Sequence, residues 1–342
     1  GKKNGISSLI IPNTFLFNVY AKKFREIMLE KYSIEYILDC TSFKIFEKAT
    51  VFNSIVLMKK NINDNKQVGY KPTKNIKNFN ELILKETMYL TKEEMLDNID
   101  NWSLAFRLDK DIISLVSKIK KNNKLIDYFP EISQGLIAYD KHRGQDEKTI
   151  KTRAFHHDNN INGEYKKWLL GENVQKYNII WNEKEWIDYN NKIANPRNPK
   201  FFIGDRILVR EITNPSIFAA LATEEMYHDP AIISILSSNN FSLKTLLAIL
   251  NSNFAKFYHF NTSPKATKGA FPKILVNDIK NFPIPIVSKV EQKTFEIIVD
   301  YVIYIKKHLN NTNIDNYVSN KHIVKQFEDV IDAMVFELYF KE

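Results

Sequence analysis

The sequence predicts an α/β segment at the start of the chain, a mixed α and β region in the middle and a helical hairpin at the end. Apolar runs at residues 6–11, 34–40 and 51–58, with an amphipathic segment after the first, predict a strand–helix–strand unit and a further strand. Residues 206–212 alternate as in a strand, and two apolar stripes at helical spacing between residues 295 and 338 predict the closing helices. Together these patterns indicate an α/β fold that continues into a mixed domain.

The first three elements follow from local signals. Pro12 ends the first apolar run, and Asn13 or Thr14 can cap a helix that extends to about Lys31. The continuous apolar character of the next two runs predicts central strands that are covered on both faces. One such unit is too little sheet for a stable α/β domain, so we expect the chain to be a fragment of a longer polypeptide.

Further elements are expected along the chain. Thr91 and Glu94 have the spacing of a capping box, which predicts a helix start. Helices are also expected over residues 109–121 and 241–257. The polar stretch NNTNIDNYVSNK separates the two closing helices and predicts a helical hairpin.

Composition indicates the kind of partner. The 342 residues suffice for about two domains, and 49 Lys+Arg against 40 Asp+Glu give a net charge of +9. This surplus favours a polyanionic partner, although the Lys and Asn codons of an AT-rich genome explain it equally well. The single cysteine, Cys40, excludes a disulfide framework, so a reducing cytoplasm is expected. No apolar stretch is long enough for a membrane span, so no membrane partner is expected.

The common catalytic motifs are missing from the sequence. It contains no GxGxxG, GxxxxGK[ST], HExxH or GxSxG pattern. The Asp-x-Lys pairs at Asp146 and Asp278 lack a partner carboxylate, and the adjacent His156 and His157 lie in a polar stretch that does not predict a metal site. We therefore expect neither a catalytic residue nor a metal site in this chain.

The start of the chain resembles a known enzyme class. The elements are Ile10-Ile11-Pro12 at a strand end, Phe24-Arg25 in a helix, a strand, Ile45-Phe46, and the apolar strand over residues 51–58. In this order they resemble the closing part of the catalytic domain of TaqI-type adenine-specific DNA methyltransferases. The segments YKKWLLGENVQKYNIIWNEKEWIDYN, RILVREIT, LLAILNSNFAKFYHF and KGAFPKILVNDIKNFPIP are similar to the target-recognition domain of the same family. That domain is common in type IIG restriction–modification enzymes.

The resemblance implies a domain organisation. Residues 1–62 would be the C-terminal remnant of a Rossmann-like methyltransferase sheet, 63–108 a connector, 109–289 a mixed α+β target-recognition domain and 290–342 the helical hairpin. The S-adenosylmethionine loop and the Asn/Asp-Pro-Pro-aromatic motif of the family would precede Gly1. S-adenosylmethionine is therefore expected for the full-length parent, no cofactor is expected for this fragment, and the fragment alone should not methylate DNA.

The implied partners are double-stranded DNA and the N-terminal catalytic portion of the same polypeptide. Two other functions remain open. One is a non-enzymatic specificity subunit like those of type I restriction systems, which the N-terminal αβ block argues against. The other is a structural or RNA-binding protein.

The resemblance also suggests site residues. Because adenine methylation requires a flipped base, Phe46 stands where the family places an aromatic ring against that base. A core phenylalanine is the alternative. Between Lys141 and Lys167 there are seven Lys+Arg against four acids, in a stretch that either reads DNA or is a solvated loop. The candidates for DNA contact there are Gln134, Tyr139, Lys141, His142, Arg143, Arg153, Lys166 and Lys167.

Other basic candidates lie further along the chain. Arg197 stands in a turn and Arg210 in the alternating strand, where a surface ion pair is the alternative role. The stretch SPKATKGAFPKIL supplies Lys265, Lys268 and Lys273, which we expect to contact DNA phosphates. The aromatic residues before it, Phe254, Phe257, Tyr258 and Phe260, follow helical spacing and are expected to be core.

Overall fold

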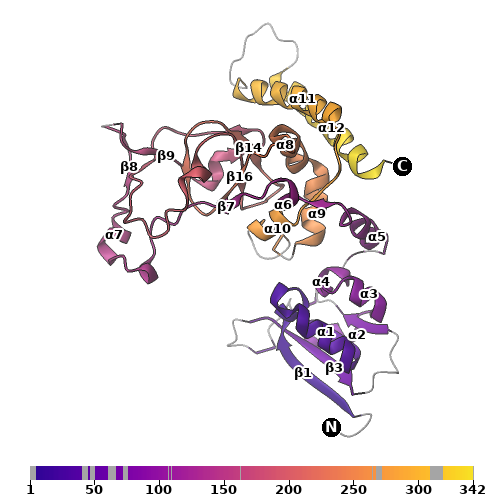
Figure 1. Cartoon of the computed structure of the whole chain (residues 1–342). Coiled ribbons are helices and arrows are strands. Elements are labelled where there is room, and N and C mark those ends of the chain that lie inside the picture. The colour runs from indigo at the N-terminus through magenta and orange to yellow at the C-terminus, as the bar shows by residue number, and fades with distance from the viewer. Residues whose placement is uncertain are drawn as a thin grey trace. The chain divides into compact units, whose positions relative to one another are not determined.

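The computed structural model describes residues 5–40, 45–46, 51–60, 67–71, 76–106, 108, 110–161, 163–263, 265–266, 272–308 and 319–341. The chain divides into two compact units, Gly1–Leu115 and Val116–Glu342 (Figure 1). Within the described residues, no helix has both the length and the apolar character that a membrane crossing requires.

The first unit contains a five-stranded sheet in the order β1-β3-β2-β4-β5. Only β2 and β4 are parallel neighbours, and the other adjacent pairs are antiparallel, so β1 and β2 run in the same direction on either side of β3. The three predicted strands are confirmed. The bounds are Ile6–Pro12 for β1, Ser33–Cys40 for β2, Asn53–Lys59 for β3, Gln67–Lys71 for β4 and Met88–Thr91 for β5.

The first helix is shorter than predicted. Two 3₁₀ turns, η1 (Asn13–Leu16) and η2 (Val19–Ala21), precede α1 (Lys22–Lys31). The buried guanidinium of Arg25 explains the break, because it donates hydrogen bonds to the carbonyl oxygens of Phe15 at 2.6 Å and Asn18 at 3.0 Å. In a continuous α-helix the Phe15 carbonyl would accept from an amide one turn later, whereas the Asn18 carbonyl accepts from the Ala21 amide, three residues on, as in a 3₁₀ turn.

The cover of the sheet is uneven. Met28 and Leu29 of α1 pack in a core with Ile37 and Val56. On the sheet, β3 alternates between buried and half-buried residues, so the expectation of strands covered on both faces is wrong for β3. A second, smaller apolar cluster contains Leu82 of α2 (Phe79–Leu84) and Cys40 of β2.

The rest of the first unit consists of short helices. Thr91 and Glu94 form the predicted capping box at α3 (Lys92–Asp97), because the Thr91 side chain accepts from the Glu94 amide and the Glu94 side chain accepts from the Thr91 amide. Next come α4 (Trp102–Ala105) and α5 (Lys110–Ile119), which spans the boundary between the two units. The predicted helix over residues 109–121 is confirmed as α5.

The second unit contains two four-stranded sheets, β14-β13-β16-β7 and β15-β9-β12-β8, and two strand pairs, β10-β11 and β17-β6. The predicted alternating strand is β13, and its first four residues are all buried because β14 and β16 flank it in a covered sheet. The bounds are β6 Asn123–Lys124, β7 Ile132–Gln134, β8 His156–His157, β9 Lys166–Leu169, β10 Val174–Gln175, β11 Asn178–Ile179, β12 Trp186–Ile187, β13 Arg206–Arg210, β14 Ala219–Ala222, β15 Tyr227–His228, β16 Ile232–Leu236 and β17 Pro283–Ile284.

Short helical turns connect these strands. They are α6 Leu125–Tyr128, η3 Lys141–Arg143, α7 Glu147–Lys151, η4 Gly171–Asn173, η5 Pro199–Phe202 and α10 Val276–Lys280. The helix predicted over residues 241–257 is two helices, α8 (Leu243–Asn251) and α9 (Asn253–Thr262). Ser252 separates them because its hydroxyl caps α9 by accepting from the Ala255 amide.

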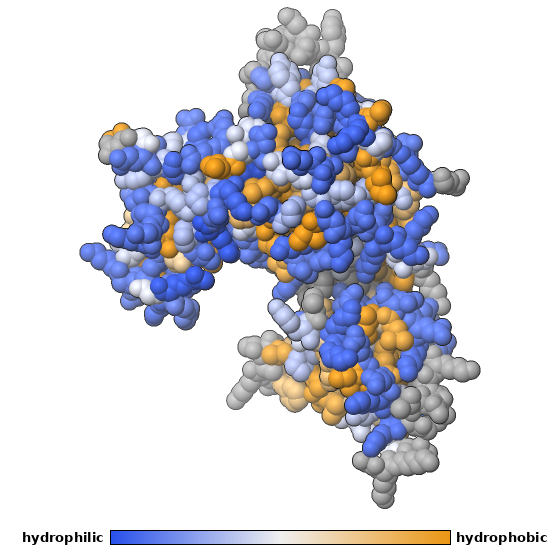
Figure 2. All heavy atoms as spheres, viewed as in Figure 1, coloured by the Kyte–Doolittle hydropathy of each residue, from blue (hydrophilic) through white to orange (hydrophobic). Residues whose placement is uncertain are grey.

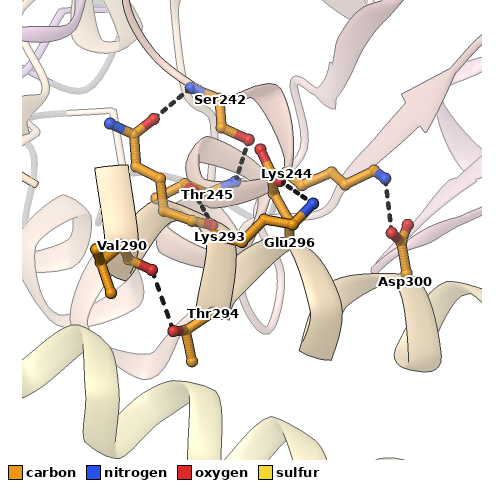
Figure 3. Close-up of polar contacts among 9 residues, drawn as sticks. Ser242, Lys244, Thr245, Val290, Lys293, Thr294, Glu296 and Asp300 are labelled. Atoms are coloured by element: carbon orange, nitrogen blue, oxygen red, sulfur yellow. Dashed lines mark hydrogen bonds and ion pairs between the residues drawn. The ribbon is translucent and has the colours of Figure 1, made fainter. Parts of the chain in front are cut away.

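Two long helices follow, α11 (Lys289–Lys307) and α12 (Asn320–Phe340), as predicted for the closing hairpin. The connecting residues 309–318 lie outside the described residues. Figure 3 shows how α11 is joined to α8: the Ser242 amide donates to Gln292, and Lys244 pairs with Asp300 at 2.7 Å. The hairpin is thereby anchored to the covered sheet through α8.

Candidate nucleic-acid interface

A lobe built on the sheet β15-β9-β12-β8, with α7 beside it, carries most of the predicted DNA-contacting residues. Within the second unit, α7 and β8 lie at the end remote from α11 and α12 (Figure 1). The lobe has its own core, which includes Phe155, Trp168 and Ile187. Its visible outer face is mostly hydrophilic (Figure 2).

Tyr139 is engaged inside this lobe. Its ring stacks on Phe155 with centroids 5.4 Å apart, and its hydroxyl accepts from the Phe155 amide at 2.9 Å. The same hydroxyl lies 2.8 Å from Nδ1 of His156. Burial raises the pKa of Tyr139, and burial lowers the pKa of His156 to about 4, so both groups are neutral at pH 7. Tyr139 therefore serves the packing of the lobe in this structure.

Two loops lie against each other on the lobe: the 140s loop, residues 139–146, and the 190s loop, residues 190–198. Arg143 donates from Nη1 to the carbonyl oxygen of Ala194 at 3.3 Å, and its Nε lies 3.7 Å from a carboxylate oxygen of Asp140. Just before the 140s loop, the Ile137 backbone exchanges hydrogen bonds of 3.0 and 2.9 Å with Asn195. Lys141 and His142 are exposed at the tip of the 140s loop.

Arg153 and Arg197 adopt left-handed backbone conformations, with φ of 49° and 60°. Residues with a Cβ rarely do so, at a cost of roughly 1–2 kcal/mol, and such strained residues cluster at functional sites. Arg197 donates from Nε to the Gly135 carbonyl oxygen at 3.3 Å, while Arg153 lies 3.7 Å from Glu185. Arg197 lies in the 190s loop, and Arg153 lies between α7 and β8.

Several predicted basic residues are paired with acids. Lys166 contacts Glu225 at 3.1 Å, and Lys167 contacts Glu224 at 2.6 Å. Lys167 also lies 5.1 Å from the centroid of the Trp181 ring. The hydrogen bond from Lys167 lowers the pKa of Glu224. DNA phosphates would have to compete with these carboxylates for the two lysines.

Two of the predicted residues, Gln134 and Arg210, lie on the covered sheet, which is β14-β13-β16-β7. Gln134 is half-buried at the end of β7, where it pairs with Ile233. Arg210 lies 5.0 Å from the ring centroid of Phe218, as in a cation–π contact. Within the described residues, neither the Gln134 nor the Arg210 side chain contacts Lys141 or His142 at the tip of the 140s loop.

The lysine-rich stretch forms a second basic site. The Lys273 amide donates to the Lys265 carbonyl oxygen at 3.1 Å, so the two residues form the stem of a loop. Lys273 pairs with Glu211 at 3.1 Å, whereas Lys265 is exposed. Lys268 lies outside the described residues.

The aromatic residues before this stretch are partly core, as predicted. Phe254 is fully buried and stacks on Tyr339 with centroids 3.7 Å apart, and Tyr258 is buried against Phe282. Phe257 and Phe260 are half-buried. The helix α9 thus provides a rigid base for the lysine-rich loop.

Phe46 belongs to the first unit. Its side chain is 52% exposed, so it is not a core phenylalanine within the described residues. Stacking on a base requires an accessible ring, and this role of Phe46 stays a prediction.

Sequence reasoning missed residues 190–192 of the 190s loop. Asn191 and Lys192 are exposed there, and Asn190 holds the turn by accepting from the Lys192 amide at 2.8 Å. Their only sequence signal is the polar turn composition of DYNNK. In the part of the chain that the structure describes, no group of His, Cys, Asp and Glu side chains is arranged to hold a metal ion. The site is therefore a basic surface built from loops on a packed lobe.

Two family models match the chain. Residues 166–284 match the TaqI-like C-terminal specificity domain, and residues 1–46 match the Eco57I restriction-modification methylase. The first match covers β9 to β17, and the second covers β1, α1 and β2. The resemblance drawn from the sequence is confirmed: the chain carries a TaqI-like specificity domain and methylase sequence at its start.

A curated relative supports the same grouping. A putative type II restriction enzyme and methyltransferase of Methanocaldococcus jannaschii is 22% identical over 352 residues. That alignment covers 100% of this chain and 28% of the relative, so the chain spans about a quarter of the relative's length.

One of two similar solved structures shares the fold. The type IIL restriction-modification enzyme MmeI, in complex with DNA, is 12% identical with a TM-score of 0.54 over 99% of this chain and 47% of that chain. The type IIG restriction endonuclease BpuSI is 12% identical with a TM-score of 0.41 over 99% of this chain and 48% of that chain. The chain therefore spans about half the length of these two structures.

Proposed function

We propose that this chain recognises a specific duplex DNA sequence for adenine methylation within a restriction–modification system. The match of residues 166–284 to a TaqI-like specificity domain carries the proposal. Those residues include three of the four strands of the lobe sheet (β9, β12 and β15) and three of the four strands of the covered sheet (β13, β14 and β16). Rigid elements that carry exposed basic and amide side chains are suited to reading base edges and phosphates.

We infer that residues 1–62 close a Rossmann-like methyltransferase sheet, which β4 and β5 of this chain extend and whose remaining parts belong to a longer parent polypeptide. The methylase match over residues 1–46 supports this inference, and it argues against a pure specificity subunit of the type I kind. In the parent, S-adenosylmethionine would donate the methyl group, and a cytoplasmic location is part of the proposal. The exposed ring of Phe46 would then stack on the flipped adenine.

DNA contact is proposed at two places of the second unit. The first is the lobe, through the predicted residues Lys141, His142, Arg143, Arg153, Lys166, Lys167 and Arg197. Of the other predicted residues, Tyr139 supports the lobe from its core, and Gln134 and Arg210 lie on the covered sheet. The second is the lysine-rich loop, through Lys265, Lys268 and Lys273. Because backbone-contacting lysines provide affinity without sequence information, the second site would position the DNA for the first.

The experiment is a titration of this chain with fluorescent duplex DNA at several salt concentrations. The logarithm of the affinity should fall linearly with the logarithm of the salt concentration, with a slope of about −0.9 for each neutralised phosphate. Lys265→Ala should flatten that slope by about 0.9 for every duplex sequence, because the Lys265 side chain is exposed and only its backbone takes part in the loop stem.

The matched control is Lys289→Ala. Lys289 is also exposed, at the start of α11, and its side chain makes no ion pair with another described residue. The control should leave the slope unchanged. Binding that ignores salt, or that favours single-stranded RNA over duplex DNA, would refute the proposed function.

A further inference from the structure

The side chain of Gln145 joins the 140s and 190s loops, which are far apart in the sequence. Its Oε1 accepts from the Asp140 amide at 2.9 Å. Its Nε2 donates to the Ala138 carbonyl oxygen at 3.0 Å and to the Lys192 carbonyl oxygen at 2.8 Å. Both amide protons are therefore used, one within its own segment and one across to a residue 47 positions away.

Each loop is also held by its own local bonds. In the 140s loop, Asp140 accepts from the His142 amide at 2.8 Å, and Gly144 ends the turn with φ of 86°. In the 190s loop, Asn190 accepts from the Lys192 amide and donates to a carboxylate oxygen of Asp188, both at 2.8 Å. Each turn is thus held locally. The backbone bonds of Ile137 with Asn195 join the segments at the base of the loops, and the side chains of Gln145 and Arg143 join the loops themselves.

This arrangement leaves four polar side chains exposed: Lys141, His142, Asn191 and Lys192. None of them makes a side-chain hydrogen bond or ion pair with another residue in the described ranges, so no protein group competes with a ligand for them. Their chemistry suits duplex DNA, because an Asn amide can bond adenine at N6 and N7 and a Lys ammonium can bond guanine or a phosphate.

We propose that Gln145 is a positioning residue that holds the 140s and 190s loops together as one recognition surface. In this surface Asn191 and Lys192 contact duplex DNA beside Lys141 and His142. Arg143 closes the same seam through Ala194, so it positions the loops as well. The inference rests on the proposed function and adds to it a second loop and the group that sets its position. A surface held rigid before binding loses less conformational entropy in the complex.

The test begins by selecting a preferred sequence for the wild-type chain from a randomised duplex library. Binding to that duplex is then compared with binding to a scrambled duplex. Gln145→Met keeps the size of the side chain but removes all three hydrogen bonds. We expect it to reduce the ratio of the two affinities by about tenfold, since misplaced loops lose base contacts of about that size. The salt slope should stay unchanged, because no phosphate-binding charge is removed.

Two matched controls separate positioning from general destabilisation. Gln175→Met removes a single local bond, from Nε2 to the Glu172 carbonyl oxygen, and should leave the ratio unchanged. Urea unfolding should show that both glutamine variants are folded, and amide exchange at Asp140 should accelerate only in Gln145→Met. Asn191→Ala should relax preference at one base-pair position, whereas Asn159→Ala, at another exposed asparagine of the lobe, should not.

The outcomes distinguish the two proposals. Wild-type binding without salt dependence would overturn the proposed function, and the two-loop surface with it. The two-loop surface alone would be overturned if wild-type binding depends on salt but selects no sequence. It would also be overturned if binding is selective and both Gln145→Met and Asn191→Ala leave the selectivity unchanged. A relaxed preference in both variants, with unchanged salt slopes, would support it.

Discussion

Replacing Gly135 with alanine should destabilise the second unit far more than a glycine substitution usually does. Gly135 follows β7 and faces the backbone after β15, and an added Cβ would lie 2.0 Å from the Asp229 carbonyl oxygen and 2.3 Å from that of His228. These obstacles are backbone atoms, which cannot rotate away. The two segments would have to separate by about 1 Å, because real Cβ atoms keep about 3 Å from such oxygens.

The magnitude follows from the bonds that this separation breaks. The Gly135 amide donates to Ile232 at 3.0 Å, and the Leu136 amide donates to His228 at 3.1 Å. Leaving these buried groups unpaired costs about 1–3 kcal/mol each, and the overpacking adds about 1–3 kcal/mol. We therefore expect Gly135→Ala to lower the free energy of unfolding by about 3–9 kcal/mol.

The assay is urea unfolding of the full chain, followed by tryptophan fluorescence, to which the second unit contributes Trp168, Trp181 and Trp186 and the first unit Trp102. With a dependence of about 1–3 kcal/mol per molar urea, the midpoint should fall by more than about 1 M. Gly163→Ala is the control. Gly163 also has a special backbone, with φ of 72°, but an added Cβ would meet nothing within 4 Å, so only about 1 kcal/mol of backbone strain is expected. Equal losses in the two variants would refute the argument from close approach.

Two other predictions concern buried ionisable side chains. Lowering the pH from 7 to 5 should destabilise the second unit, because burial lowers the pKa of His156 and His259 to about 4 and that of His228 to about 3, whereas unfolded histidines bind protons near pH 6.5. Burial raises the pKa of Asp229 to about 6, so the folded chain binds about one more proton at this carboxylate and opposes the effect of the histidines. The free energy of unfolding should therefore fall by about 2.7 kcal/mol per pH unit near pH 5. A urea midpoint that stays constant from pH 7 to 5 would contradict this prediction. In the first unit, Arg25→Met should cost about 3–5 kcal/mol in hydrogen-exchange protection of β2 and β3, because four main-chain carbonyls lose a hydrogen bond from the guanidinium. Lys23→Met, at an exposed position of the same helix, should cost less than about 0.5 kcal/mol. Similar losses in the two variants would show that the hydrogen bonds from Arg25 to the carbonyls contribute little.

The sequence by itself determined the elements whose signals are local. The strands β1, β2 and β3, the capping box at α3, and the helices α5, α11 and α12 all follow from apolar periodicity or from side chains within one turn of a helix end. The order of motifs also determined the family resemblance, which the matches over residues 1–46 and 166–284 confirm. These features were predictable because each depends on neighbours in the chain.

Only the tertiary structure decided which polar residues are used for packing. Arg25 favours the break in the first predicted helix because its guanidinium donates to the carbonyls of Phe15 and Asn18, which lie before α1. Arg206, which by sequence pattern shares a strand with Arg210, is fully buried and donates to the carbonyl oxygens of Gly204, Glu224 and Met226. No local pattern distinguishes such an arginine from an exposed one.

The candidate interface shows the same limit most clearly. The basic residues of the 140s loop and Arg197 are visible in the sequence, but the meeting of the 140s and 190s loops is not, because it depends on bonds between distant segments, among them those of Gln145 and Arg143. Whether a polar side chain is free for a ligand depends on which distant groups the fold brings within hydrogen-bond distance. Composition and spacing predict a basic DNA-binding region, and the contacts between distant segments decide which of its side chains remain free.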